Sequence, residues 1–118
     1  MTEPLPEAHV AAQVMTELTP AELVPLLRGE GLDAHFCQST YKGAWVWLEG
    51  ADDTDCTLEP IEPGEYLLRD GFGERHALEP LARHLSAALV RLGIRHRMEL
   101  YDEDHHMVDY LHHDWPLD

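Results

Sequence analysis

LEPLARHLSAALVRLGI, residues 78–94, is the stretch that most clearly specifies an element of this fold. Its apolar residues recur at the 3.6-residue spacing of a helix with one apolar face: Leu78, Leu81, Ala82, Leu85, Ala88, Leu89 and Leu92. Gly93 and the apolar Ile94 match the end of a helix in a Schellman motif. We therefore predict a helix that begins near Glu79, ends at Leu92 and packs its leucine face on a sheet.

Short segments with strand character lie on both sides of this helix. They are rich in β-branched, aromatic or alternating apolar residues and cover residues 32–38, 44–49, 56–58, 65–69, 95–101 and 106–113. These segments form hairpins and do not alternate regularly with helices. The sequence therefore predicts a single α+β domain over residues 1–118, with an antiparallel or mixed sheet of about five to six strands and the long helix across one face.

Two short helices are predicted ahead of the first strand. Three apolar residues spaced four apart in residues 1–18 favour a short peripheral helix: Val10, Val14 and Leu18. Thr19 and Glu22 match a capping box, so a second helix should follow them and end near Gly29 or Gly31. Pro25 falls beyond the first turn of that helix, where it should cause a kink or an early end.

The charge of the chain is its most unusual property. Its 118 residues contain 8 Lys and Arg against 23 Asp and Glu, which gives a formal net charge of −15. Few cations remain for phosphate contacts, which argues against a nucleic-acid partner and against docking to an anionic membrane. Because 44% of the residues are hydrophobic, the acidity does not predict disorder.

The charge is also unevenly distributed along the chain. Residues 1–68 carry a net charge of −11 and residues 98–118 carry −7, whereas residues 69–97 contain six arginines and carry +3. Two acidic zones thus flank a mildly basic helix. Self-repulsion at this charge destabilises a compact domain, and a basic partner would relieve it. The alternative is that the charge only maintains solubility.

Composition also bears on the compartment. The two cysteines, Cys37 and Cys56, are too few for a disulfide scaffold, so we expect reduced thiols in a cytoplasmic protein, with a single bridge in a periplasmic protein as the alternative. The chain opens without a secretory apolar region, and its longest apolar run, Ala44–Leu48, is far shorter than the roughly 20 residues of a membrane span. Frequent Ala, Leu, Arg, Gly and Pro beside the single lysine, Lys42, indicate a GC-rich bacterial genome.

No catalytic motif accompanies these features, and we predict neither an enzyme nor a cofactor. The chain lacks GxSxG, P-loop, HExxH and CxxC patterns. Histidines and carboxylates do concentrate in the C-terminal hairpin, and a metal bound there would use ligands that lie across it: His96, His106, Asp102 and His112. We expect instead a rim of solvated histidines and no metal site.

Aromatic residues provide the remaining candidate contacts. Trp45 and Trp47 share one face of their strand, while Ala44, Val46 and Leu48 share the other. One set faces a second core layer or a partner, and the sequence leaves both possibilities open. With Tyr41, the two tryptophans are candidate anchors for a protein partner.

Together these features favour a small acidic bacterial inhibitor, either an immunity protein of a toxin or a nucleic-acid mimic. It would bind and block a basic protein partner, such as a toxin or nuclease, by occupying its active cleft. The expected contact residues lie in two acidic turns, on the aromatic strand and in the turn before that strand: Asp52, Asp53, Asp55, Asp102, Glu103, Asp104, Trp45, Trp47 and Tyr41. A structural or adaptor domain is the first alternative, and a metal-binding protein or metal-dependent enzyme built on the C-terminal hairpin is the second.

Overall fold

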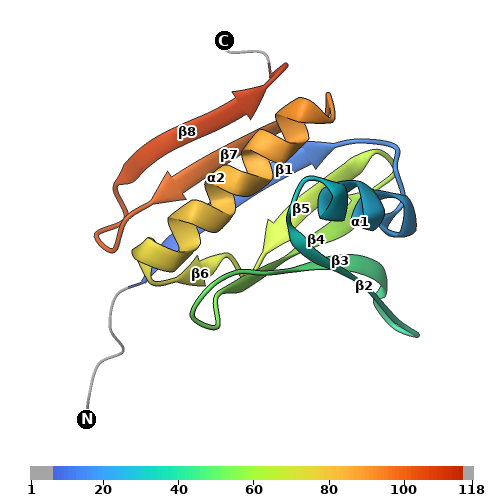
Figure 1. Ribbon diagram of the computed structural model, residues 1–118, viewed down its shortest axis with the longest axis horizontal. Helices are drawn as coiled ribbons and strands as arrows, with labels where there is room; N and C mark the ends of the chain where they lie inside the picture. Colours follow the sequence, from blue (N-terminus) through green and yellow to red (C-terminus); the bar gives the residue numbers. More distant parts are fainter. Residues whose placement is uncertain (1–6, 116–118) are drawn as a thin grey trace.

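The computed structural model describes residues 7–115, which form an α+β domain of two helices and one antiparallel sheet (Figure 1). The elements in chain order are β1 (Ala8–Met15), α1 (Pro20–Gly29), β2 (Asp33–Ser39), β3 (Gly43–Glu49), β4 (Asp55–Glu62), β5 (Glu65–Arg69), β6 (Phe72–Gly73), α2 (Arg75–Arg91), β7 (Arg95–Tyr101) and β8 (Met107–His113). The predicted fold class is confirmed. The sheet has 8 strands, more than the sequence indicated.

The strand order places the N-terminal strand inside the sheet. Along the sheet the order is β2-β3-β4-β5-β1-β7-β8, and the short β6 also pairs with β1. Every neighbouring pair is antiparallel. β1 thus joins two hairpin systems that lie far apart in the sequence.

The prediction of a helix in residues 1–18 is wrong where the structure describes them, because Ala8–Met15 is a strand; residues 1–6 lie outside the described part. Val10 and Val14 are four residues apart, a spacing that fits one face of a helix and one face of a strand equally well. Ala8 and Ala12 are buried with them, and the residues between are more exposed. Burial thus alternates from one residue to the next, as expected of a strand that is covered on one face only.

The ends of both helices follow local sequence signals. The Thr19 side chain accepts a hydrogen bond from the Glu22 backbone N–H at 3.3 Å, and the Glu22 carboxylate accepts one from the Thr19 backbone N–H at 3.0 Å. At the end of α2, Gly93 has a φ of 70° and the Ile94 N–H donates to the Leu89 carbonyl at 2.8 Å. The capping box and the Schellman motif are both confirmed.

Prolines proved less reliable as markers of helix ends. α2 begins at Arg75, so the predicted start near Glu79 is wrong and Pro80 lies inside the helix. α1 runs for 10 residues with Pro25 inside it. A proline removes one helical hydrogen bond, and both prolines are exposed, where water can satisfy the carbonyl that lacks a partner.

Both helices lie on the same side of the sheet, and the core lies between them and it (Figure 1). The face of α2 that carries Leu78, Leu81, Leu85 and Leu89 is buried there. No helix of residues 7–115 covers the other side of the sheet, which we call the open face. β3, whose sequence is apolar on both faces, has Val46 and Leu48 in the core and its tryptophans on the open face, without a second core layer of helices over them in residues 7–115.

The two cysteines lie on different sides of the sheet. Cys56 is buried in the core, and burial raises the pKa of its thiol to about 12. Cys37 pairs in register with Trp45 on the open face and is half-buried. Both are free thiols, so the alternative of a single bridge between them is wrong. Within the described residues no helix is long and apolar enough to span a membrane.

The buried α2 face yields a first test. Leu85 is fully buried, so Leu85→Asp should lower the free energy of unfolding by several kcal/mol, about 3 or more, because it buries an unpaired charge. Ala87→Asp, two residues along the same helix but exposed, is the matched control. Urea denaturation measures both variants. Equal stability for the two would contradict the assignment of this face to the core.

A buried histidine yields a second test. His96 is fully buried; its Nδ1 lies 3.0 Å from the Ile94 carbonyl and its Nε2 lies 2.8 Å from the Ser86 hydroxyl. The neutral ring satisfies both contacts, donating to the carbonyl and accepting from the hydroxyl. Burial above all, and then the nearby charges of His113 and His112, lower the pKa of His96 below 6.5, although the Ile94 contact opposes the shift.

A lowered folded-state pKa means that the unfolded chain binds the proton first as the pH falls. The contribution of His96 to stability should therefore be complete above pH 6.5 and decline below it. Urea denaturation of the wild-type protein and His96→Leu from about pH 8 to about pH 5 isolates this contribution from those of the other histidines. If the free energy of unfolding changed with pH in the same way in both proteins, the proposed contribution of His96 would be contradicted.

Candidate functional site

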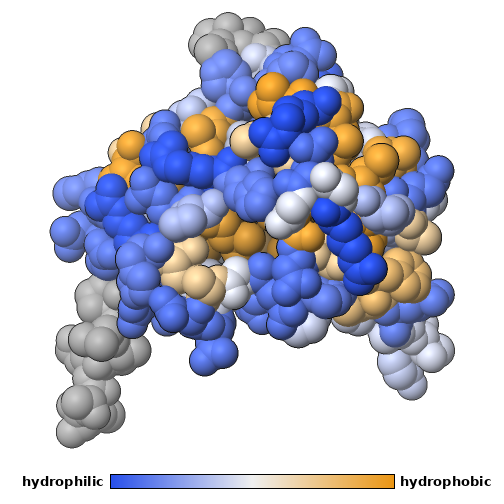
Figure 2. Space-filling model, viewed as in Figure 1, coloured by the Kyte–Doolittle hydropathy of each residue, from blue (hydrophilic) through white to orange (hydrophobic). Residues whose placement is uncertain are grey.

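Two acidic turns meet at one end of the molecule, at the N-terminus of α2. One joins β3 to β4 and the other joins β7 to β8, and the first turn of α2 lies between them (Figure 1). Six carboxylates gather there, and we call this group the acidic end: Asp52, Asp53, Glu74, Asp102, Glu103 and Asp104. Hydrophilic residues predominate over this part of the surface (Figure 2).

Contacts to α2 fix the positions of the two turns. The His76 Nε2 atom lies 2.9 Å from the Asp52 carboxylate, and its Nδ1 atom lies 3.2 Å from the carboxylate of Glu74, the N-cap of α2. Asp102 has a lowered pKa, mainly because its carboxylate accepts a backbone hydrogen bond from His106, with a smaller contribution from the charge of Arg75. Arg75 and His76 thus stand between acids that are far apart in the sequence.

The β3–β4 turn projects two carboxylates into solvent. Asp52 and Asp53 have φ values of 53° and 60°, and the Thr54 N–H donates to the Ala51 carbonyl at 3.0 Å. Two successive residues with positive φ, enclosed by a hydrogen bond between the residues before and after them, are typical of a type I′ hairpin turn. Aspartate adopts this left-handed backbone conformation more readily than most residues. Both side chains are exposed.

The three acids of the β7–β8 turn differ in their roles. The Asp102 carboxylate accepts hydrogen bonds from the backbone N–H groups of Asp104 and His106, both at 2.9 Å, and so shapes the turn. Glu103 and Asp104 are exposed. These two carboxylates are therefore available to a partner, whereas that of Asp102 is engaged in the fold.

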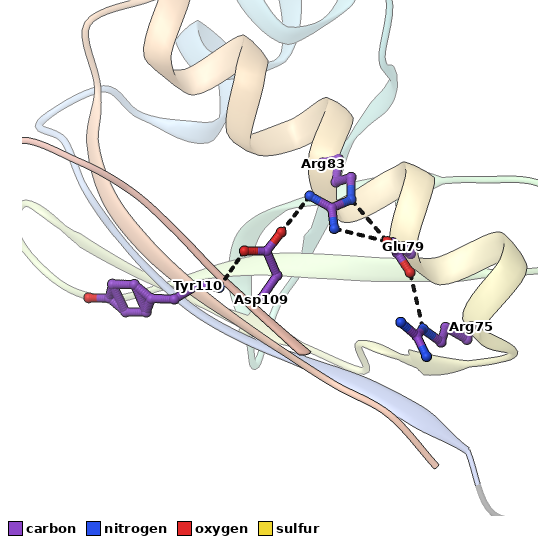
Figure 3. Close-up of polar contacts among 5 residues, drawn as sticks. All are labelled: Arg75, Glu79, Arg83, Asp109 and Tyr110. Carbon is purple, nitrogen blue, oxygen red and sulfur yellow. Dashed lines mark hydrogen bonds and ion pairs between the residues drawn. The ribbon is translucent and has the colours of Figure 1, made fainter. Parts of the chain in front are cut away.

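The arginines near the acidic end form their ion pairs with other acids. Glu79 accepts hydrogen bonds from Arg75 at 3.1 Å and from Arg83 at 2.9 Å, and Arg83 also pairs with Asp109 of β8 at 2.5 Å (Figure 3). The hydrogen bonds from Arg83 and Arg75 lower the pKa of Glu79. Within residues 7–115 no Lys or Arg side chain lies within 4.0 Å of a carboxylate of the acidic end.

An exposed aromatic ring lies next to the acidic end. Phe72 of β6 is 59% exposed and pairs in register with His9 of β1. The His9 ring stacks on Tyr101 at 4.5 Å between centroids and lies 5.5 Å from His105 in the β7–β8 turn. The position of Phe72 beside the acids depends on the pairing of β6 with β1.

The predicted aromatic anchors are not gathered at this end. Trp45 and Trp47 are half-buried on the open face, where the Lys42 ammonium lies 4.8 Å from the Trp45 ring centroid. Tyr41 is fully exposed in the turn that precedes β3, at the opposite end of that strand from the acidic end. Asp55 was expected in the loop but is the first residue of β4, where it accepts a hydrogen bond from the Trp47 indole at 3.1 Å.

The residues named for a possible metal site in the hairpin are also separated. His96 is buried, and both of its ring nitrogens lie within hydrogen-bond distance of other groups. His112, on β8, is exposed and lies opposite Arg97 of β7. His106 and Asp102 belong to the turn. In the part of the chain that the structure describes, these four do not form a group of convergent ligands.

A different group of possible ligands does converge, and the sequence reasoning missed it. Asp33, His35 and Glu49 place one oxygen or nitrogen atom each within 4.8 Å of one another. The signal was present in the strand pattern, because Asp33 and His35 share a face and a hairpin turn at residues 39–43 aligns Asp33 with Glu49. The cluster could be found from the sequence only once the pairing register of β2 and β3 was known.

Comparison with known proteins supplies no further assignment. No protein-family model, no curated protein and no solved structure matches this chain.

Proposed function

We propose that this protein binds a basic protein partner, such as a toxin or a nuclease, through its acidic end and blocks it by occupying its active cleft. One observation carries the proposal: two acidic turns, distant in sequence, come together beside α2 without a neutralising Lys or Arg within ion-pair distance in residues 7–115. Charge maintained for solubility alone would not need to be concentrated in this way.

The acidic end suits electrostatic capture of a cationic cleft. Carboxylates of one sign on one surface steer an oppositely charged partner and raise the association rate, by about tenfold to a thousandfold at low salt. The backbone hydrogen bonds of both turns hold the acids in place before binding. A preorganised surface loses little conformational entropy on association.

Charge steers association, but an apolar centre is needed to slow dissociation. The exposed Phe72 ring lies 5.9 Å from the His9 ring, which in turn lies 5.5 Å from that of His105 in the β7–β8 turn. Met107, the first residue of β8, directly follows that turn and is 54% exposed. An apolar centre with a charged rim is the usual arrangement of a protein–protein interface. We therefore add Phe72 to the predicted anchors, with Trp45 and Trp47 as a second contact region on the open face.

The role of the acids is tested with two charge-reversal variants that change the net charge by the same amount at different places on the surface. The variant Asp52→Lys/Glu103→Lys reverses two exposed acids of the acidic end. The matched control, Glu17→Lys/Glu62→Lys, reverses two exposed acids beside the β4–β5 turn. Co-purification from the native host, read by mass spectrometry, identifies the partner, and stopped-flow mixing then measures association at several salt concentrations.

The acidic-end variant should associate at least tenfold more slowly than the control at low salt and should show a weaker salt dependence. Inhibition of the partner should fall in parallel. If both variants associate and inhibit like the wild-type protein, the acids serve solubility and the protein is a structural or adaptor domain.

The role of Phe72 as an apolar anchor is tested through the dissociation rate. Phe72→Ala should raise the dissociation rate about tenfold or more and change the association rate little, because it removes contact area and leaves the charge intact. Trp47→Ala tests the second contact region in the same way, with circular dichroism to confirm folding. Surface plasmon resonance separates the two rates. Unchanged dissociation for Phe72→Ala would exclude this ring as an anchor.

A further inference from the structure

The corner of the open face formed by β2 and β3 brings three potential metal ligands together. Asp33 and Glu49 are opposite each other in the β2–β3 register, and His35 follows on the same face of β2. The His35 Nε2 atom lies 2.9 Å from an Asp33 oxygen and 2.9 Å from a Glu49 oxygen. An imidazole nitrogen is thus placed between two carboxylates.

This cluster carries more negative charge than its partners compensate. A single imidazole serves two carboxylates, and Asp55, opposite Glu49 on β4, adds a third acid nearby. By comparison Glu59, also on the open face, has two cationic partners: Lys42 at 2.6 Å and Arg69 at 3.6 Å. In residues 7–115, neither Asp33 nor Glu49 has a Lys or Arg within ion-pair distance.

The two separations from the His35 nitrogen to the carboxylate oxygens also fit a metal ion. Ligand bonds of about 2.1 Å, usual for nitrogen and oxygen donors, place two donors 2.9 Å apart when the angle at the metal is near 90°. That angle joins neighbouring ligands of an octahedral ion. The side chains of Asp33, His35 and Glu49 are 63%, 34% and 40% exposed, which leaves water access to the remaining positions.

We propose that Asp33, His35 and Glu49 bind one divalent first-row transition metal ion, with water completing the coordination shell. One imidazole and two carboxylates suit Mn²⁺, Fe²⁺ or Zn²⁺, whereas the nitrogen ligand disfavours Ca²⁺ and Mg²⁺. The ion would connect edge strand β2 to β3 and stabilise the corner of the sheet. These three ligands are not among the residues of the acidic end, although Glu49 directly precedes the β3–β4 turn, and the metal proposal does not depend on the proposed function.

Paramagnetic broadening by MnCl₂ tests the site in the wild-type protein. The Trp47 indole N–H donates to Asp55 beside the cluster, whereas the Trp115 indole lies against Arg95 and Arg97 of β7, on the other side of β4, β5 and β1. Substoichiometric Mn²⁺ should broaden the Trp47 indole signal well before that of Trp115 in ¹⁵N-resolved NMR spectra. Equal broadening of the two signals would overturn the proposal.

Variants then assign the ligands. Titration calorimetry with MnCl₂ and ZnCl₂ should give one ion per chain, with affinity at least tenfold weaker in Glu49→Gln and in His35→Gln. Glu59→Gln and His112→Gln, on the same face but outside the cluster, should bind like the wild-type protein. Wild-type affinity in both ligand variants, or equal losses in the controls, would show that the metal binds adventitiously and would refute the site.

Discussion

The packing of the leucine face of α2 against β1 and β7 is the contact on which the rest of the structure depends. Leu85 and Leu89 are fully buried there, as are Val14 of β1 and Met98 of β7. Because β1 pairs with β5, β6 and β7, fixing it under the helix also fixes the two hairpin systems on either side. One apolar contact thereby sets the arrangement of segments from both ends of the chain.

The same contact determines where the charges lie. With α2 across the sheet, its first turn reaches the end at which β3 joins β4 and β7 joins β8 (Figure 1). The arginines of the helix pair with Glu79, Asp109 and Glu30, and so hold α2 to β8 and to the segment after α1. The helix arginines are thus paired with other acids, and within residues 7–115 the acidic turns on each side of α2 have no Lys or Arg within ion-pair distance.

A sheet covered by helices on one side only leaves a second, independent surface. Trp45 and Trp47 lie there because alternate residues of a strand point to opposite faces, and Val46 and Leu48 occupy the core face. That surface also holds the cluster of Asp33, His35 and Glu49. The acidic end and the open face therefore present different chemistry, carboxylates beside a phenylalanine in one case and mixed nitrogen and oxygen ligands beside tryptophans in the other.

By itself the sequence determined what depends on neighbouring residues: the leucine face and glycine end of α2, the capping box at Thr19, the acidic turns and the α+β class. It did not distinguish a strand from a helix at Val10 and Val14, since four residues satisfy both periods, nor did it place the start of α2, since Pro80 is tolerated inside the helix. Only the tertiary structure put β1 inside the sheet, gathered the acidic turns around α2 and set Asp33 opposite Glu49. The reason is that these features depend on strand pairing and helix docking between distant segments, whose partners no local pattern specifies.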